Sequence, residues 1–365
     1  MEKKSKKFPL NFFNKKTIFI TGINGFKGFW LYLILKYLGA KVYGVGLNKD
    51  DYLIFKKLKI KESNFYKEID IINYKKLKNF IKSKNPDIIF HLASESLVID
   101  CYKKPLKAIQ TNLLGLSNLL SILREIKIKK KIGINIVTSD KCYLPKFKKS
   151  YVETDELGGN DIYSATKACQ EILTQSFSYS FFKENKNVYI NTLRAGNVIG
   201  GGDYSKNRLF PDIYRSIKNN TKLSIRNLNS SRPWQHVLDC VNGYLLAAKF
   251  SYLKKKKFDS WNFSSEYKSK KVSEILDILV KTKILKKKII KFIKNKIDKT
   301  KYLNLNSKKA KKILKWNSAY KLNDSIKETF LVYEILDKKI NYNKKKILLN
   351  KRLTFFLEKV YGNSF

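Results

Sequence analysis

The stretch KTIFITGINGFKG, residues 16–28, decides the fold of this chain of 365 residues. Its first six residues have the apolar character of a buried parallel strand, and residues 29–38 have the apolar density of a buried helix. Three glycines with G-x-x-G-x-x-G spacing lie between these elements: Gly22, Gly25 and Gly28. Glycine lets the backbone turn sharply and approach a pyrophosphate, which the amino end of a helix attracts. A strand, a glycine turn and a helix in this order therefore predict a dinucleotide site, with an unliganded βα turn as the alternative.

Further apolar runs alternate with helical patterns along the chain. The predicted strands are residues 41–46, 64–67, 87–94, 132–137, 187–195 and 260–263. This order favours an α/β fold, a Rossmann-type doubly wound parallel sheet with a smaller, interleaved C-terminal substrate-binding domain. The glycine, proline and arginine between residues 198 and 232 suit a substrate pocket. The predicted segments are a dinucleotide-binding domain of residues 1–193 plus 234–264, a substrate domain of residues 194–233 plus 265–340, and an unassigned tail of residues 341–365.

Two short motifs between residues 137 and 167 carry the predicted chemistry. Ser139, Asp140 and Lys141 follow an apolar run, so they emerge at the carboxyl end of a strand, where open α/β sheets place their active sites. Tyr163 and Lys167 are four residues apart in a helical pattern, so they share one helix face. An ammonium close to a phenol favours the phenolate, so we expect Lys167 to lower the pKa of Tyr163 and make it a base. Taken alone, Tyr-x-x-x-Lys also fits an ordinary helix face.

The charge of the chain is strongly basic. Lys and Arg total 76 against 30 Asp and Glu, which gives a formal net charge of +46 and suggests a polyanion such as nucleic acid as partner. The excess is lysine scattered along the chain among isoleucine and asparagine, whereas a nucleic-acid face is a confined patch with interleaved arginine and aromatic residues. We therefore expect solvated surface lysines and no nucleic-acid partner. A basic nucleic-acid-binding protein on the same fold stays open as the alternative from a different class.

Cysteine, histidine and apolar patterns exclude several classes of protein. The four cysteines show neither pairing nor metal-type spacing, and two histidines are too few for a His-based metal centre, so we expect no metal site. We interpret His91 as a packed strand residue. No apolar run reaches the ~18 residues of a membrane span. The lysine-rich amino terminus lacks the apolar stretch of a secretory signal. These features predict a reduced, cytoplasmic protein without a membrane partner.

The glycine turn and Tyr-x-x-x-Lys together resemble the extended short-chain dehydrogenase/reductase superfamily. Within its NAD-dependent epimerase/dehydratase family, the CDP-glucose 4,6-dehydratase group is similar in five segments: residues 21–28, 138–143, 161–168, 194–203 and 232–239. The likeness runs from about residue 12 to residue 263. It implies NAD as cofactor and a sugar nucleotide as substrate, with CDP-D-glucose converted to CDP-4-dehydro-6-deoxy-D-glucose and water by a lyase. It also implies a homodimer or homotetramer through paired long helices.

The resemblance implies cofactor contacts along the first half of the chain. They are Gly22, Gly25, Phe26, Gly28, Asn48, Asp70, Ile71, Leu92, Ala93, Ser94, Tyr163 and Lys167. An acidic residue after the second strand usually binds the ribose hydroxyls and selects NAD, but Asn48 and Lys49 stand there, so NADP stays open. Asp70 is expected on the adenine, with a helix cap as the alternative. Relatives carry Ala-Gln where this chain has Ser94-Glu95, so no glutamine role is transferred.

Arginine is rare in this chain, and most of it falls in or next to the predicted pocket region of residues 198–232. Five arginines fall between residues 194 and 232: Arg194, Arg208, Arg215, Arg226 and Arg232. A guanidinium retained among so many lysines suits bidentate binding of a sugar-nucleotide pyrophosphate. We predict Asn197, Arg208 and Arg232 as phosphate contacts, and Arg226 and Arg215 as weaker candidates. Two of the five arginines are expected to contact ligand, and the others can make structural ion pairs.

The resemblance also implies a reaction sequence for the two motifs. Tyr163, helped by Lys167 and Ser139, removes the proton of the sugar 4-hydroxyl while a hydride leaves C4. The 4-ketone acidifies C5, water is lost across C5 and C6 with Asp140 protonating the leaving hydroxyl, and the hydride returns to C6. Lys141 stands where many sugar-nucleotide 4,6-dehydratases have a glutamate base. It acts either as a neutral base at C5 or as a stabiliser of the enolate oxygen.

Another enzyme on the same scaffold is the main alternative. A 4-epimerase, or a dehydratase for a UDP, GDP or dTDP sugar, would share the glycine turn and the tyrosine. An epimerase only removes a hydride and returns it to the opposite face, so it needs no acid/base pair such as Asp140-Lys141. The pair therefore favours elimination.

Overall fold

A seven-stranded parallel sheet forms the centre of the protein. The computed structural model describes residues 8–47, 53–126, 128–145, 150–225, 227–265, 269–292 and 304–362. Each neighbouring pair of strands in this sheet is parallel. Because β1 lies between β2 and β4, the predicted Rossmann-type doubly wound sheet is confirmed. The strand order is β12 (Phe258–Phe263), β7 (Val188–Ala195), β5 (Ile132–Val137), β4 (Ile88–His91), β1 (Thr17–Thr21), β2 (Lys41–Gly46) and β3 (Tyr66–Glu68).

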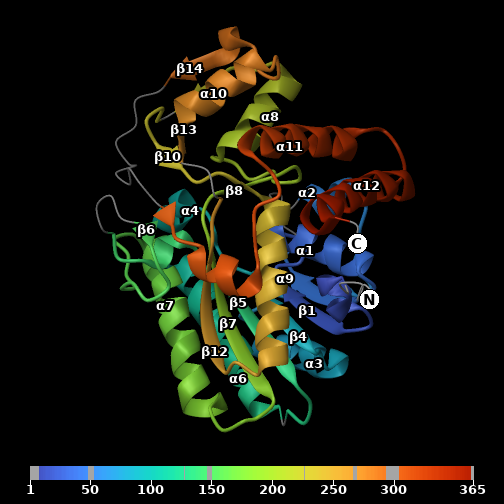
Figure 1. Cartoon of the computed structure of the whole chain (residues 1–365), viewed down its shortest axis with the longest axis vertical. Coiled ribbons are helices and arrows are strands. Elements are labelled where there is room, and N and C mark those ends of the chain that lie inside the picture. The colour runs from blue at the N-terminus through green and yellow to red at the C-terminus, as the bar shows by residue number, and fades with distance from the viewer. Residues whose placement is uncertain are drawn as a thin grey trace, which may run out of the picture.

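Helices cover both faces of the sheet (Figure 1). One large buried apolar cluster joins the sheet to three of them: α1 (Phe26–Tyr37), α9 (Val237–Lys254) and α12 (Tyr342–Tyr361). A second cluster lies on the opposite face and joins the sheet to three others: α3 (Tyr74–Lys84), α6 (Gly115–Glu125) and α7 (Ile162–Phe177). Strands that are buried on both faces read as continuous apolar runs, which is why they could be located from the sequence.

The helical segment between Pro105 and Glu125 has an internal irregularity. It consists of α5 (Pro105–Ile109), a π-helical turn (Gln110–Leu114) and α6. Pro105 stands in the first turn of α5, where a missing N–H costs nothing. The π turn contains Asn112, which is fully buried. Single π turns are frequent at functional sites. Two shorter helices, α2 (Leu53–Lys57) and α4 (Val98–Lys103), follow β2 and β4.

A smaller unit with its own apolar cluster lies at the top of Figure 1. It contains α8 (Leu209–Asn219), β9 (Leu223–Ile225), β10 (Ser231–Arg232), β13 (Lys270–Lys271), α10 (Val272–Lys281) and β14 (Ile290–Phe292). Short parallel pairs connect it to the rest: β8 (Val198–Ile199) with β11 (Gln235–His236), and β6 (Ser150–Tyr151) with β15 (Asn304–Leu305). Helix α11 (Leu322–Asp337) contributes its first half to this cluster and its second half to the large one. The limits of the two domains stay a prediction.

The end of α11 ties the two parts together. Asp337 forms ion pairs with Lys57 of α2 and Lys218 of α8, and it accepts a hydrogen bond from the Tyr214 hydroxyl at 2.6 Å. Burial alone would raise the pKa of Asp337, but the hydrogen bonds from Lys218, Lys57 and Tyr214 lower it to about 2. One carboxylate therefore stabilises the contact between the Rossmann part and the helix that begins after Arg208.

The C-terminal residues belong to the large core. Helix α12, within the tail left unassigned from the sequence, buries four apolar side chains there: Leu349, Leu353, Phe356 and Leu357. Tyr361 near its end contacts the ring of Phe8 with centroids 5.1 Å apart. Trp316, which we placed in the substrate domain, is also fully buried in this core and donates a hydrogen bond to the Asp239 carbonyl at 2.9 Å. Helix α12 and Trp316 therefore both pack in the core of the Rossmann part.

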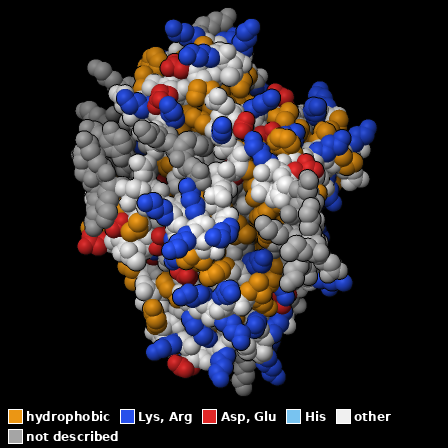
Figure 2. All heavy atoms as spheres, in the orientation of Figure 1, with side chains coloured by type: hydrophobic (Ala, Val, Ile, Leu, Met, Phe, Trp, Pro, Cys, Tyr) orange, Lys and Arg blue, Asp and Glu red, His pale blue; other side chains and the backbone are white. Residues whose placement is uncertain are grey.

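The visible face of the molecule carries lysine and arginine side chains over all of its parts, mixed with acidic and apolar residues (Figure 2). This distribution agrees with scattered surface lysines. In the ranges that the structure describes, no helix has the length and apolar character needed to cross a membrane. Across the same ranges, no three His, Cys, Asp or Glu side chains are grouped in a way that could hold a metal ion.

Candidate active site

A cavity of about 1650 Å³ opens at the carboxyl ends of β1, β4, β5 and β7, facing the smaller unit. This is the switch point of the sheet, where open α/β folds bind ligands. Asn48 and Arg226 lie outside the described residues, so their roles stay predictions. The other predicted site residues all line the cavity: Gly22, Gly25, Phe26, Gly28, Asp70, Ile71, Leu92, Ala93, Ser94, Ser139, Asp140, Lys141, Tyr163, Lys167, Asn197, Arg208 and Arg232.

The glycine turn packs too closely for side chains. Gly22 has a φ of +72°, and a Cβ atom there would lie 2.8 Å from the Ala93 nitrogen. A Cβ atom on Gly28 would lie 2.0 Å from the Gly22 carbonyl oxygen. Helix α1 begins after Gly25, which offers no side-chain cap, so the first N–H groups of the helix are left for another acceptor. This backbone cradle beside the cavity fits the pyrophosphate of a dinucleotide.

Asn24 holds the glycine turn against the second strand. Its amide donates hydrogen bonds to the Leu47 carbonyl at 2.6 Å and to the Tyr66 hydroxyl at 3.2 Å. A Cβ atom on Gly46 would lie 2.0 Å from the Asn24 Oδ1 atom. Sequence reasoning missed this residue, because it occupies a variable position of the glycine pattern. Gly46, at the end of β2, was the available signal.

The predicted adenine contacts, Asp70 and Ile71, follow β3 and line the cavity. Asp70 accepts a hydrogen bond from the Ile72 N–H at 3.1 Å, while the cap of α3 is Asn73, which accepts from the Lys76 N–H at 3.0 Å. The helix-cap alternative for Asp70 is therefore wrong. Ile71 packs so tightly that a Cβ atom on Gly115 would lie 2.3 Å from its Cδ1 atom. Asp70 stays available for a ligand on the cavity wall.

Asn112 braces the loop after β4. Its Oδ1 atom accepts hydrogen bonds from the Ser94 hydroxyl and the Glu95 N–H, both at 2.8 Å. Its amide donates to Thr166 on α7 at 2.9 Å, so the contact of Asn112 is with the helix that carries Tyr163. The π turn supplies this geometry, because it leaves backbone groups of the helix free to bond side chains such as Gln170, which donates to the Asn112 carbonyl at 2.8 Å.

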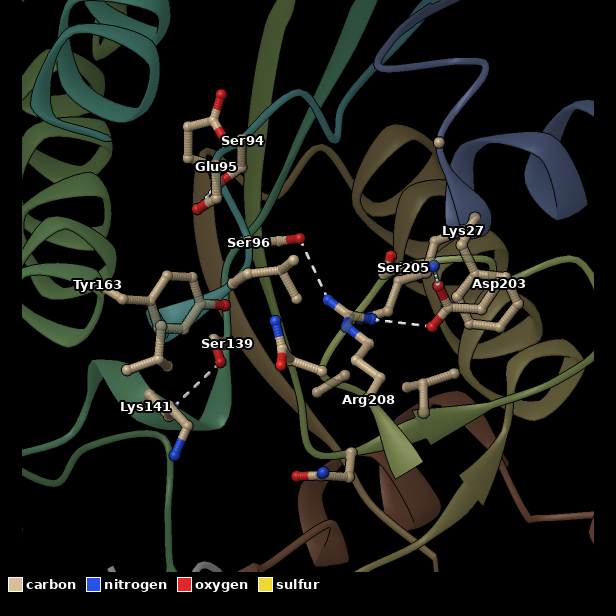
Figure 3. Close-up of a pocket in the computed structure, with 18 of the residues that line it drawn as sticks. Lys27, Ser94, Glu95, Ser96, Ser139, Lys141, Tyr163, Asp203, Ser205 and Arg208 are labelled. Carbon is tan, nitrogen blue, oxygen red and sulfur yellow. Dashed lines mark hydrogen bonds and ion pairs between the residues drawn. The ribbon is translucent and has the colours of Figure 1, made fainter. Parts of the chain in front are cut away.

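Ser139, Asp140 and Lys141 form a tight turn at the end of β5. The Ser139 hydroxyl donates to Asp140 Oδ1 at 2.9 Å and accepts from the Lys141 N–H at 3.2 Å. The second oxygen of Asp140 is buried and has no hydrogen-bond partner among the described residues. Figure 3 shows Tyr163, Ser139 and Lys141 along one wall of the cavity and Arg208 opposite them. The turn therefore presents an unpaired carboxylate oxygen and an amine to one ligand.

Burial controls the titration of Tyr163 and Lys167. Burial raises the pKa of Tyr163 to about 12, and a hydrogen bond with Ser139 only partly opposes it. The Lys167 ammonium lies 5.9 Å from the centre of the Tyr163 ring and donates to Gln170 Oε1 at 2.9 Å. Burial and the charge of Lys27 lower the pKa of Lys167 to about 7. Our expectation of a lowered tyrosine pKa is wrong for the ligand-free protein, because desolvation outweighs a lysine that is itself partly neutral.

The low pKa of Lys167 predicts a pH-dependent stability difference. Below about pH 7 both the folded and the unfolded chain hold this proton, and the folded chain carries the full cost of a buried charge. Between that pH and the unfolded pKa of about 10.4 the unfolded chain binds more protons, so stability rises with pH. Lys167→Met removes the charge. In urea unfolding without ligand, we expect its gain over the parent to be largest below pH 7 and to shrink above it. A difference that stays constant with pH would contradict the buried charge.

Of the four clustered arginines that the structure describes, Arg208 and Arg232 line the cavity. Arg208 donates to Asp203 at 3.2 Å and to the Ser96 hydroxyl at 3.1 Å, so its guanidinium crosses from the smaller unit to the loop after β4 (Figure 3). Arg232 is buried and donates to the Ser231 carbonyl at 2.9 Å. Asn197 lines the cavity and accepts the Gln235 N–H through its carbonyl. Arg208 and Arg232 are therefore the described arginines placed to contact an anionic ligand.

The other residues of this region have structural contacts. Arg215 donates to the carbonyls of Tyr204 and Ser205 at 2.8 and 3.0 Å, and Arg194 forms a buried ion pair. His91 is buried in β4 with its Nδ1 atom 2.9 Å from the Thr21 hydroxyl, and burial lowers its pKa to about 3. Its interpretation as a packed strand residue is confirmed. Lys27, which we had not singled out, lines the cavity from the first turn of α1.

The family model for GDP-mannose 4,6 dehydratase matches residues 19–329 of this chain. The chain is also 39% identical over 273 residues to the CDP-glucose 4,6-dehydratase of Salmonella typhimurium, covering 73% of this chain and 76% of that protein. This match confirms the resemblance drawn from the motifs.

Solved structures share the fold. The dTDP-glucose 4,6-dehydratase of Bacillus anthracis, crystallised in complex with NAD, has a TM-score of 0.72 at 20% identity and covers 87% of this chain and 96% of its own. An epimerase of Methanothermobacter thermautotrophicus has a TM-score of 0.76 at 20% identity and covers 91% and 97% of the two chains. At such identity these neighbours show the architecture alone. The family model spans most of the sequence and shows the family: the chain belongs to the GDP-mannose 4,6-dehydratase family.

Proposed function

We propose that the protein is a lyase that dehydrates a nucleotide-activated hexose, converting CDP-D-glucose to CDP-4-dehydro-6-deoxy-D-glucose and water. The observation that carries this proposal is the shared cavity of two motifs, with Asp140 and Lys141 at the end of β5 and Tyr163 on α7. For removal of the hydride from C4, the protein needs to supply only the tyrosine as a base. Loss of water needs an acid and a base in addition, and the turn supplies a carboxyl and an amine. The relative that is 39% identical is itself named a CDP-glucose 4,6-dehydratase.

The cavity residues fit NAD, with NADP left open by the charge near the ribose site. The glycine turn and the start of α1 would hold the pyrophosphate, and Asp70 and Ile71 would hold the adenine. Leu92, Ala93 and Ser94 would lie along the nicotinamide half. When bound, NAD supplies the acceptor, and later the donor, of one hydride. The protein contributes the geometry of the contacts and the proton transfers.

The proton transfers are assigned to side chains of the two motifs. Tyr163 would take the proton of the sugar 4-hydroxyl, with Ser139 hydrogen-bonded to it and Lys167 beneath the ring. Asp140 would give a proton to the leaving 6-hydroxyl from its unpaired carboxyl oxygen, which is buried at the cavity wall. Lys141 would remove the C5 proton as a neutral amine or stabilise the enolate oxygen. General acid–base groups of this kind contribute about 10²–10⁴-fold each.

The anionic half of the substrate would lie toward the smaller unit. Arg208 and Arg232 provide guanidinium groups, which suit a diphosphate because each can form two parallel hydrogen bonds. Asn197 would add an amide contact. To bind phosphate, Arg208 would exchange its bonds with Asp203 and Ser96 for bonds with the ligand. Arg226 stays a weaker candidate.

The direct test is a comparison of sugar nucleotides. Purified protein with NAD is incubated with CDP-, UDP-, GDP- and dTDP-hexoses, and the products are identified by mass spectrometry and NMR. We expect loss of one water from CDP-glucose and a 4-keto-6-deoxy product. A product of unchanged mass with inverted C4 would favour the 4-epimerase alternative. Absence of any product, together with nucleic-acid binding that is lost at moderate salt, would favour the binding protein.

We infer a homodimer, or a tetramer built from it, through two neighbouring helical segments. Exposed apolar side chains with helical spacing lie on α4 and α5 at Tyr102, Leu106 and Ile109, and on α7 and the turn after it at Ile172 and Tyr179. Apolar stripes of this kind are typical of protein interfaces. A cytoplasmic location also stays a prediction, which rests on the unpaired cysteines.

Leu106→Asp is expected to break this interface. Leu106 is 66% exposed in the single chain, so the substitution costs little folding stability, but it would bury a charge between two copies. Leu253→Asp is the matched control, because Leu253 is 52% exposed on α9, away from the stripe. Light scattering after size exclusion should give half the parent mass for Leu106→Asp alone. A parent that is already monomeric, or equal masses for both variants, would contradict the interface.

A further inference from the structure

A buried ion pair lies directly behind the catalytic turn. Glu171 on α7 and Arg194 on β7 are joined at 2.7 Å, and their side chains are 1% and 3% exposed. Neither residue lines the cavity. They therefore contact no ligand there, and any effect on the reaction must pass through other side chains.

The pair holds the catalytic turn at both ends. Before the turn, the Thr138 hydroxyl donates a hydrogen bond to Glu171 Oε1. After the turn, the Tyr143 hydroxyl accepts a hydrogen bond from Arg194 Nη1 at 2.7 Å. Ser139, Asp140, Lys141 and Cys142 lie between these two anchors. The position of the turn is thus set by one pair of side chains.

The same pair is rigidly connected to the helix of the other motif. Glu171 is four residues after Lys167 and eight after Tyr163 on α7, so the three side chains follow one face of the helix. Burial and Lys27 lower the pKa of Lys167, and the carboxylate of Glu171 opposes them. A shift of Glu171 would therefore change both the electrostatics of Lys167 and the distance between helix and turn.

The surroundings fix the guanidinium in one orientation. Arg194 Nη1 also donates to the Glu153 carbonyl at 2.9 Å, and the guanidinium lies 4.9 Å from the centre of the Tyr143 ring. Tyr143 in turn donates to Asn262 at 2.8 Å. A lysine at position 194 would keep the charge but could not bond Glu171 and Tyr143 in the same planar arrangement. Buried pairs contribute little net stability compared with apolar packing, so geometry is the better reason for this one.

We propose that Glu171 and Arg194 are positioning residues that set the elimination groups Asp140 and Lys141 in register with Tyr163. This inference rests on the proposed function. Tyr163 and Lys167 keep their own contacts within α7 when the pair is loosened, whereas the turn loses both of its anchors. Loss of the pair should therefore slow the elimination of water more than the oxidation at C4. Misplacement of a reacting group by about 1 Å can cost ~10²-fold.

The test compares four variants with the parent. Arg194→Lys and Thr138→Val each remove an anchor, and Thr138→Ser keeps the hydroxyl. Arg352→Lys is the matched control, because Arg352 likewise pairs with a glutamate, bonding Glu328 at 2.9 and 2.6 Å, and does not line the cavity. With a substrate that carries deuterium on C4, the loss of deuterium from C4 gives the rate of oxidation. The mass of the product gives the rate of water loss. We expect the ratio of water loss to oxidation to fall at least about tenfold in the first two variants and to stay near the parent in the other two.

A second measurement needs no activity. In the ligand-free protein, amide hydrogen exchange of residues 138–143 should be faster in Arg194→Lys and Thr138→Val than in the parent, and unchanged in Arg352→Lys. A purely structural role predicts lower stability with an unchanged ratio, and that result in an active parent would overturn the positioning role alone. A parent that oxidises no sugar nucleotide would overturn the proposed function as well.

Discussion

Replacement of Tyr163 by phenylalanine is expected to lower kcat by about 10²–10⁴-fold, which is the usual contribution of a general base. The side chain is 8% exposed and its ring packs against Cys101 and Ala108, so the variant keeps the packing and loses only the hydroxyl. Without that hydroxyl the proton of the sugar 4-hydroxyl has no acceptor beside Ser139. The effect should appear in kcat, while the affinity for NAD changes little.

Tyr320→Phe is the matched control for this variant. Tyr320 is 2% exposed, and its hydroxyl has no hydrogen-bond partner among the described residues, but it lies in the large core and does not line the cavity. We expect parent-like turnover from it. Steady-state kinetics with the preferred sugar nucleotide, and NAD titration of both variants, make the comparison. Turnover of Tyr163→Phe within threefold of the parent would remove the tyrosine from the mechanism.

The pH dependence of the reaction should reflect the high pKa of Tyr163 in the ligand-free protein. Because burial holds the pKa of Tyr163 near 12 in the ligand-free protein, the phenolate is scarce at neutral pH. The tyrosine must therefore lose its proton during the reaction or after ligands have changed its surroundings. This is consistent with a base that works beside a lysine whose own pKa is about 7.

The central sheet could be predicted because its signals are local. Strands buried on both faces are mostly apolar. The glycine turn is fixed by backbone contacts within a few residues and by the loop after β4. Once the strands were located, the residues at their carboxyl ends were known as well. This is why Ser139 and Asp140 could be placed at the cavity. Helix α12 was not assigned, because its buried face is defined by contact with distant residues such as Phe8.

Contacts between distant segments could not be read from the sequence. The sequence did not show which of the five clustered arginines make structural ion pairs. Arg194 is one that does: it pairs with Glu171 inside the protein and does not line the cavity. Two features of the sequence pointed to this pair. Glu171 continues the four-residue spacing of Tyr163 and Lys167, and arginine is rare in this chain. The pKa of Tyr163 was also misjudged, because helix spacing gives the neighbour but not the degree of burial.

The largest effect on elimination is expected from Lys141→Met, with a decrease of at least about 10²-fold in product formation. Lys141 is half-buried at the cavity wall beside Ser139, and methionine keeps most of its length without the amine. Oxidation at C4 should continue, because Tyr163, Lys167 and Ser139 are unchanged. Lys206→Met controls for the loss of one positive charge, since Lys206 is exposed and does not line the cavity.

Solvent deuterium at C5 separates the two roles of Lys141. If its amine is the base, Lys141→Met should oxidise C4 but take up no deuterium at C5, because the carbanion never forms. If it stabilises the enolate oxygen, exchange at C5 should slow in proportion to product formation. Asp140→Asn provides the complementary result: exchange at C5 should persist while the 6-hydroxyl stays on the sugar, since only the acid is missing. Near-normal turnover of Lys141→Met would exclude both roles and leave the C5 proton to another group of the cavity.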